Sequence, residues 1–234
     1  MDRFRSHVSV GALLVVAVSV SGCLRIGGGG GGGGGAADLD ARFDEVKALM
    51  LTTDMPTELN ATYDGGMKVG VRDTGRTNTG TGGQYDDVDG IFSADLSIEV
   101  AWNESMSPNA NISGSASNFK GTFYGEDGER NVDLGGSLTV TPGSGGIVRT
   151  EITPAITLPS GLASGAIQFQ MTGGLTDPDS EDDSVWMSLL LGGNFYGSGA
   201  EAAYGTVSGT LYDDDQLTIP GGAASGEFYL KKKP

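Results

Sequence analysis

Beyond residue 60, most of this chain consists of short stretches in which apolar and polar residues alternate one by one. Every second residue from Ala94 to Trp102 is apolar, and the residues between them are polar or small. The same alternation occurs from Tyr63 to Arg72 and from Ile167 to Met171. Because successive side chains of a β-strand point to opposite faces, this period of two predicts strands with one face in a core and the other in water.

Glycine and turn-forming residues separate these stretches, and no helical pattern long enough for a crossover lies between them. Further strands are predicted at 112–119, 136–141, 147–152, 186–195, 203–211 and 226–230. Antiparallel strands in this arrangement form a sandwich or a barrel, and the barrel is favoured because closure removes exposed strand edges. The expected fold class is all-β: an eight-stranded (eight or nine) antiparallel up-and-down β-barrel, with a short N-terminal helix after a Gly-rich tether.

Residues 38–60 are expected to form that short amphipathic helix and a connector to the barrel. The apolar residues Leu39, Phe43, Val46 and Met50 recur at helical spacing, and Asp38 is the expected N-cap. A helix this short is marginal alone and should dock on an apolar surface. The stretch 186–191 is apolar on both faces, so we expect it to be a strand whose outer face the helix covers.

The first 22 residues have the features of a secretory signal peptide. Arg3 and Arg5 precede an apolar segment, Val8–Val20, which is shorter than the roughly 20 residues needed to span a bilayer. Val20-Ser21-Gly22-Cys23 follows and resembles the lipobox of bacterial lipoproteins. This resemblance implies cleavage before Cys23 and acylation (palmitate and related chains) of its thiol.

An unbroken run of glycines, Gly27–Gly35, follows the cysteine within a linker that we place at 23–37. Such a run is a flexible tether, and about 12 residues of it would average roughly 20 Å between their ends. Leu24 stands where an aspartate would retain a lipoprotein at the inner membrane. The lipobox resemblance therefore implies a lipid-anchored protein of the outer membrane, with exposure at the cell surface left open.

The chain holds few groups for catalysis or metal binding. Its only histidine, His7, is lost with the signal peptide, and its only cysteine would carry lipid. This excludes catalytic triads that use histidine or cysteine, and it excludes zinc sites built from those residues. The carboxylates cluster in turn-like stretches rather than in apolar surroundings, where their pKa values would be shifted for catalysis. We expect no enzyme, no cofactor and no metal site. The net charge of −16 disfavours nucleic acid as a partner.

Two acidic stretches, 85–90 and 177–183, could offer oxygen ligands to calcium. Neither completes an EF-hand loop with its terminal glutamate. Acidic runs are usually solvated, so these stretches are predicted to be solvent-facing turns, with a calcium-stabilised adhesive module as an alternative. The triple aspartate at 213–215 is predicted to be a hairpin turn.

The segment Leu191–Leu211 contains a Gly-x-Phe-Tyr-Gly stretch, then Ala-Glu, then a strand of small residues. The positions concerned are Gly193, Phe195, Tyr196, Gly197, Ala200, Glu201 and Gly205. This pattern resembles the barrel domain of the transferrin-binding protein B family, and the stretch ATYDGG at 61–66 resembles the first strand of such domains. The resemblance covers 61–230 and implies a β-barrel on a lipidated, tethered chain. It gives the seven residues a structural role, in which one aromatic side chain packs inward and Gly197 permits an unusual backbone turn.

The function expected from the sequence is that of a non-catalytic outer-membrane lipoprotein, joined to the membrane through the lipid on Cys23. Its tethered barrel would bind a macromolecular partner, such as a protein, or shield the cell surface. The chain has one barrel rather than two lobes, so the resemblance does not extend to transferrin recognition. A lipocalin-like carrier of a small ligand is the other alternative, and it would require a cavity inside the barrel.

Overall fold

Ten strands and one α-helix form the part of the chain that the computed structural model describes, which is residues 36–73, 90–125, 128–152, 161–178, 180–212 and 220–234. The helix is α1 (Ala36–Lys47), and a 3-10 turn, η1, spans Glu104–Met106. The strands are β1 (Glu58–Asp73), β2 (Gly90–Asn103), β3 (Asn111–Gly125), β4 (Gly128–Gly136), β5 (Leu138–Val140), β6 (Gly146–Glu151), β7 (Ala163–Asp177), β8 (Ser180–Tyr196), β9 (Ala202–Tyr212) and β10 (Pro220–Lys232). Within these ranges, no helix has the length and apolar character needed to cross a bilayer. The predicted signal peptide, Cys23 and the glycine run lie outside the described residues.

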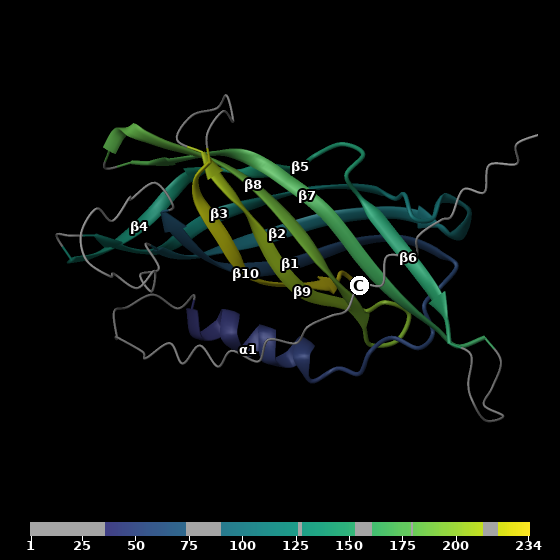
Figure 1. The fold of residues 1–234 in the computed structure, drawn as a ribbon. Coiled ribbons are helices and arrows are strands. Elements are labelled where there is room, and N and C mark those ends of the chain that lie inside the picture. Colours follow the sequence, from purple (N-terminus) through teal and green to yellow (C-terminus); the bar gives the residue numbers. More distant parts are fainter. Residues whose placement is uncertain (1–35, 74–89, 126–127, 153–160, 179, 213–219) are drawn as a thin grey trace, which may run out of the picture. The chain divides into compact units, whose positions relative to one another are not determined.

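The sheet closes on itself as a ring of eight antiparallel strands (Figure 1). Its order is β1-β10-β9-β8-β7-β4-β3-β2, and pairing of β2 with both β1 and β3 closes the ring. The two short strands β5 and β6 pair with β7 beside this path. The predicted fold class, an eight-stranded antiparallel barrel with an N-terminal helix, is therefore confirmed.

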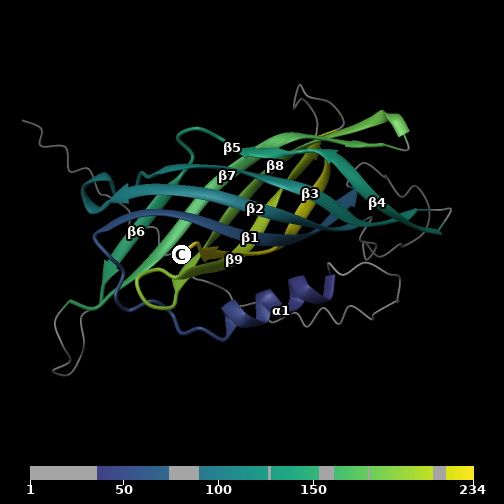
Figure 2. The ribbon, with the colours of Figure 1, turned by 180° about the vertical axis from the view of Figure 1, so that it is seen from behind.

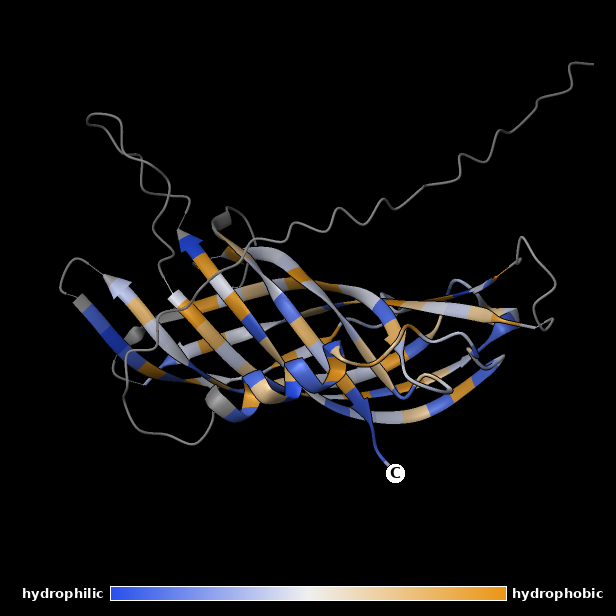
Figure 3. Cartoon of the chain, turned by 90° about the horizontal axis from the view of Figure 1, so that it is seen from below, coloured by the Kyte–Doolittle hydropathy of each residue, from blue (hydrophilic) through white to orange (hydrophobic). Residues whose placement is uncertain are grey.

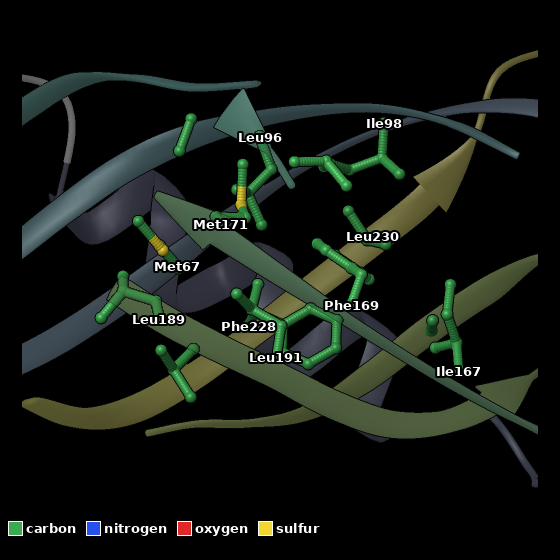
Figure 4. Packing of buried hydrophobic residues seen from close by; sticks show 14 of the residues in the cluster. Met67, Leu96, Ile98, Ile167, Phe169, Met171, Leu189, Leu191, Phe228 and Leu230 are labelled. Carbon is green, nitrogen blue, oxygen red and sulfur yellow. The ribbon is translucent and has the colours of Figure 1, made fainter. Parts of the chain in front are cut away.

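The alternating apolar residues meet inside this ring. Hydropathy alternates along the strands in Figure 3, and Figure 4 shows side chains from opposite sides of the barrel packed together. Phe169 of β7 and Phe228 of β10 are both fully buried, and their ring centroids lie 6.1 Å apart in an edge-to-face arrangement. Met67 and Leu191 also belong to this core. Large side chains thus fill the barrel, as is usual for barrels of this size.

The connector between α1 and β1 packs against one end of the barrel, which we call the closed end. Thr52 N donates to Phe195 O at the end of β8 (3.0 Å), and Met55 N donates to Ala163 O at the start of β7 (2.9 Å). Met55 is buried in the core. The side chain of Arg149 reaches across the same end and donates from Nε to Met55 O (3.0 Å). Backbone pairing and one buried methionine therefore cover the strand ends here.

Helix α1 lies on the outer surface of β9 and β10. Phe43 packs edge-to-face on Tyr229 with 4.8 Å between ring centroids, and Lys47 Nζ lies 2.9 Å from a carboxylate oxygen of Glu227. Partial burial raises the pKa of Glu227, but hydrogen bonds and charge from Lys47, together with a hydrogen bond from Tyr204, outweigh this and hold the pKa below its ordinary value. An apolar contact and a partly shielded ion pair therefore hold the helix.

Three expectations about the helix are wrong. The helix ends at Lys47, because the chain must then enter the closed end, and Met50 lies beyond it with 84% of its surface exposed. Asp38 is in the first helical turn, where it pairs with Arg42, rather than at the N-cap. The helix does not cover the outer face of 186–191 either, and Leu190 is 42% exposed there.

Two differences concern the strands. The sequence did not predict β4, and the predicted strand 136–141 is divided at Ser137, after Gly136 takes a φ of +97°. Asp177, expected in a solvated turn, is buried at the end of β7 and forms an ion pair with Arg130 of β4. An aspartate at this position is stabilised because a guanidinium on the neighbouring strand compensates its buried charge. The stretches 85–90 and 213–215 lie outside the described residues.

The outer surface of the barrel carries its charge unevenly. Outward-facing residues of β1 and β2 include Asp64, Lys68, Asp95 and Glu99. Glu151 ends β6 with an exposed carboxylate, and the side chains of residues 181–184 in β8 lie outside the described part of the chain. Apart from these, the outward-facing residues of β6–β9 that we call the neutral face contain no aspartate, glutamate, lysine or arginine. They are Gly146, Val148 and Thr150 of β6; Ser164, Ala166, Gln168, Gln170, Thr172, Gly174 and Thr176 of β7; Trp186, Ser188, Leu190, Gly192 and Asn194 of β8; and Thr206, Ser208 and Thr210 of β9.

Substitution of Phe169 by alanine tests the filled interior. We expect Phe169→Ala to lower the free energy of unfolding by about 3–5 kcal/mol, because it leaves a cavity among fully buried neighbours. Met50→Ala is the matched control, with an expected change within about 0.5 kcal/mol because that side chain is 84% exposed. Urea unfolding followed by tryptophan fluorescence measures both. Equal effects of the two substitutions would contradict a packed interior.

Candidate functional site

The residues that carry the family resemblance gather at the turn between β8 and β9, at the closed end. Strand β8 ends at Tyr196 and β9 begins at Ala202. Between them Gly197, Gly199 and Ala200 all have positive φ, of 71°, 60° and 61°. Gly197 takes this conformation without steric cost, as expected from the sequence. Ala200 has a Cβ, so its left-handed conformation must be held by its surroundings.

The two aromatic residues of the turn lie on opposite faces of the sheet. Phe195 is buried in the barrel core, and its ring centroid lies 6.4 Å from that of Tyr63. Tyr196 faces outward and packs against Tyr204, with 6.2 Å between centroids, in the apolar cluster beneath α1. One aromatic residue thus stabilises the interior while its neighbour contributes to the docking surface of the helix.

Gly193 and Gly205 stand directly opposite each other in the β8–β9 pair. A Cβ atom at Gly193 would lie 2.3 Å from the carbonyl oxygen of Tyr204, and one at Gly205 would lie 2.1 Å from that of Gly192. Both distances are far inside van der Waals contact. The two strands approach so closely here that a side chain at either position would force them apart.

Tyr63 connects the turn to β1 through the interior. Its hydroxyl donates a hydrogen bond of 2.8 Å to the carbonyl oxygen of Ala200, and the tyrosine is fully buried. Burial raises the pKa of Tyr63 well above its ordinary value, so the hydroxyl keeps the proton that it donates. Tyr63 belongs to the ATYDGG stretch, so the two separate stretches of the family resemblance are in contact, and this bond holds Ala200 in its unusual conformation.

The connector binds the same turn from outside the barrel. Asp54 accepts hydrogen bonds from Ser198 Oγ (2.6 Å) and Gly199 N (2.9 Å), and Thr52 Oγ1 donates to Gly197 O (2.7 Å). The hydrogen bonds from Ser198 and Gly199 lower the pKa of the Asp54 carboxyl. No local sequence pattern indicates this contact, because Asp54 lies 144 residues from Ser198.

Glu201, the remaining position of the pattern, is exposed. Its carbonyl oxygen accepts a hydrogen bond from the backbone N of Lys232 at the end of β10 (2.8 Å). Its carboxylate lies beside Gly197, where an added Cβ would come within 2.7 Å of Oε2. The turn therefore contacts β1, β10 and the connector, and its polar groups bind other parts of the chain. This arrangement can close the barrel.

Figure 2 shows the side of the barrel formed by β1, β2 and β3. Two grooves lie on the outside of the barrel over these strands. The larger, of about 930 Å³, is open to solvent and is lined by polar side chains such as Thr62, Glu99 and Ser113. The smaller, of about 540 Å³, lies beside α1 at Arg42 and Asp95. In the described ranges, no group of three or more histidine, cysteine, aspartate and glutamate side chains is placed to hold a metal ion. The acidic stretch 85–90 is outside those ranges and 177–183 is described only in part.

Comparison with known proteins assigns no family. No protein-family model matches the chain, and no curated protein matches it. Among solved structures, DynF from the dynemicin biosynthesis pathway of Micromonospora chersina is similar, with 14% sequence identity and a TM-score of 0.42 over 80% of this chain and 86% of DynF. A likeness this distant does not establish a shared fold or a shared activity.

Alanine substitution at the opposed glycines tests the close approach of β8 and β9. We expect Gly205→Ala to lower the free energy of unfolding by about 2 kcal/mol or more, because the new methyl group would overlap the Gly192 carbonyl. Gly192→Ala is the matched control, since a Cβ there meets nothing within 4 Å, and we expect a change within about 0.5 kcal/mol. Thermal unfolding measures both. A harmless Gly205→Ala would contradict this packing.

The lowered pKa of Asp54 predicts a pH dependence. The pKa of Asp54 in the folded protein lies below the ordinary value of 3.8, which applies to the unfolded chain. The ionised carboxylate therefore stabilises the fold fully at pH values above 3.8, and this stabilisation is lost as the pH falls through the lowered pKa of the folded protein. Asp54→Asn should therefore cost about 1 kcal/mol at neutral pH, and this cost should shrink in acid. Urea unfolding of both proteins between neutral pH and the acid limit measures the difference. Asp44→Asn, on an exposed aspartate of α1, controls for loss of one charge, and a cost independent of pH would refute the contact.

Proposed function

We propose that this chain is a non-catalytic lipoprotein of the outer membrane, anchored by lipid on Cys23, whose tethered β-barrel binds a macromolecular partner through its outer surface. A role in shielding the cell surface is compatible with the same arrangement. The N-terminal sequence supports the anchor, through the apolar segment Val8–Val20, the small residues before Cys23 and the glycine run that follows.

The filled interior of the barrel carries the proposal for an outer binding surface. The core residues Phe169 of β7, Phe228 of β10 and Tyr63 of β1 are completely buried inside the ring. A carrier of the lipocalin type needs an interior cavity for its ligand. Aromatic and aliphatic side chains occupy that space here, while the connector packs across one end. Binding on the outside is therefore the reading that the geometry favours.

The contact between Tyr63 and Ala200 supports the resemblance to the barrel domain of transferrin-binding protein B. These residues belong to the two stretches on which the resemblance rests, and a buried hydrogen bond of 2.8 Å joins them. Because the two stretches are in contact in the folded barrel, there is a physical reason for both to occur in the same chain. We propose a barrel of this kind, with a partner whose identity the residues do not specify.

Substitution of Cys23 tests the anchor. In a Gram-negative host we expect the mature chain to begin at Cys23, to carry acyl chains detectable by mass spectrometry, and to fractionate with the outer membrane. Cys23→Ala should remove the acyl mass and release the protein from membranes, because no lipid would hold it. Ser21→Ala, a small-for-small change beside the cleavage site, is the matched control and should leave acylation intact. An unmodified Cys23 in purified membranes would overturn the proposal.

Surface location and partner can be tested in the same cells. Protease added to intact cells should cleave a surface-exposed barrel and spare one that faces the periplasm. Crosslinking before extraction should then retain the wild-type protein in a larger complex. A barrel found only in the cytoplasm would contradict both the anchor and the partner.

A further inference from the structure

The neutral face, defined above on β6–β9, is unusual for a chain that carries 30 acidic and 14 basic residues. Charged residues make up 19% of the sequence, yet none occurs among the outward-facing residues of this face. Strands β6, β7, β8 and β9 pair side by side, so the face is continuous (Figure 1). Among the side chains that the structure describes, the charged residues of these four strands lie outside the neutral face, as Glu151 does at the end of β6 and Asp177 at the end of β7.

The exposed groups of this face suit burial against another surface. Val148 and Leu190 are 44% and 42% exposed although both are apolar. Polar neighbours already satisfy one another, since Gln170 Nε2 donates to Ser188 Oγ at 2.8 Å. Covering such a surface desolvates no ion, which is the costly step in burying charged groups. Depletion of charge is also what distinguishes the central part of a protein interface from the remaining surface.

The uncharged, polar composition of the neutral face also indicates which partner covers it. Glutamine, asparagine, serine and threonine side chains each carry a donor and an acceptor, so a surface built from them can pair with a copy of itself across a two-fold axis. An acidic surface cannot do so, because like charges would face each other. Each chain has a net charge of −16. Two copies can therefore pack together without carboxylates facing carboxylates only through surfaces that contain no carboxylates.

We propose that the neutral face is the interface of a homodimer, in which β6–β9 of one copy pack face to face on β6–β9 of a second. A standard interface takes about 20–30 residues from each partner, and the outward-facing residues of four strands approach this number. Packing of two sheets face to face is a common arrangement of β-structure. The interface does not depend on the lipid anchor or on any family resemblance.

The remaining charges give the dimer a specific response to salt. At low ionic strength, carboxylates outside the interface on one copy repel those on the other copy. Added salt screens this repulsion, because the Debye length falls to about 10 Å at 0.1 M salt. The dimer should therefore tighten as salt is added. An association held by oppositely charged contacts would weaken under the same change.

Sedimentation equilibrium of the full exported chain tests the proposal. The chain would carry Cys23→Ser, which removes both lipid and thiol. We expect a reversible dimer whose dissociation constant falls between about 0.02 M and about 0.15 M salt. Leu190→Lys should weaken the dimer at least tenfold, because it places an unpaired charge within the neutral face that the second copy would bury. Gln168→Lys should act in the same direction.

Ser113→Lys is the matched control, since it adds the same charge to an exposed position on β3, outside the neutral face. It should change the dissociation constant by less than about twofold, and circular dichroism should show all three variants folded. A protein that stays monomeric at both salt concentrations would overturn the proposal. A dimer that remains intact in the Leu190→Lys variant would also overturn it. The same holds if Ser113→Lys weakens the dimer as much as Leu190→Lys does, or if added salt dissociates the dimer.

Discussion

Apolar packing inside the closed ring of strands is the interaction on which the rest of this structure depends. Residues from every second position of the ring strands meet in one core, and the largest of them, such as Trp102, Phe169 and Phe228, are buried almost completely. Closure places these side chains inside and also removes the free edges that an open sheet would expose. The connector, the helix and the β8–β9 turn are all arranged against this core or against its outer surface.

The closed end shows how the N-terminal region is tied to the barrel. Asp54 and Thr52 bind the β8–β9 turn from outside, while Tyr63 binds it from within. Met55 fills the space that a side chain at Gly165 would otherwise occupy, since a Cβ there would lie 2.5 Å from the methionine sulfur. Strain at Ala200 is therefore offset by contacts on both sides, and the segment that precedes β1 is part of the folded unit.

Local alternation predicted most strands because each carries one apolar and one polar face, as from Ala94 to Trp102. Strand β4 was missed because Val132 and Leu134 are its only large apolar residues, too few to show a period of two. The predicted helix continued to Met50 because apolar spacing alone does not show that the chain must leave the helix after Lys47 to reach the ends of β7 and β8. The site was predicted in part: glycine and aromatic residues marked the turn, but Asp54 and the bond between Tyr63 and Ala200, which spans 137 residues, depend on the tertiary fold.

Amide hydrogen exchange measured by NMR tests the central claim, that the barrel is closed and filled, most directly. A closed ring has no free edge, so slow exchange should extend to both sides of β1 and β2, including the amides that pair β1 with β10 and β2 with β3. Cross-strand contacts between Met67 and Phe228 should appear in the same spectra, as this register requires. Rapid exchange along the whole length of one ring strand, without those contacts, would show an open sheet and contradict the account.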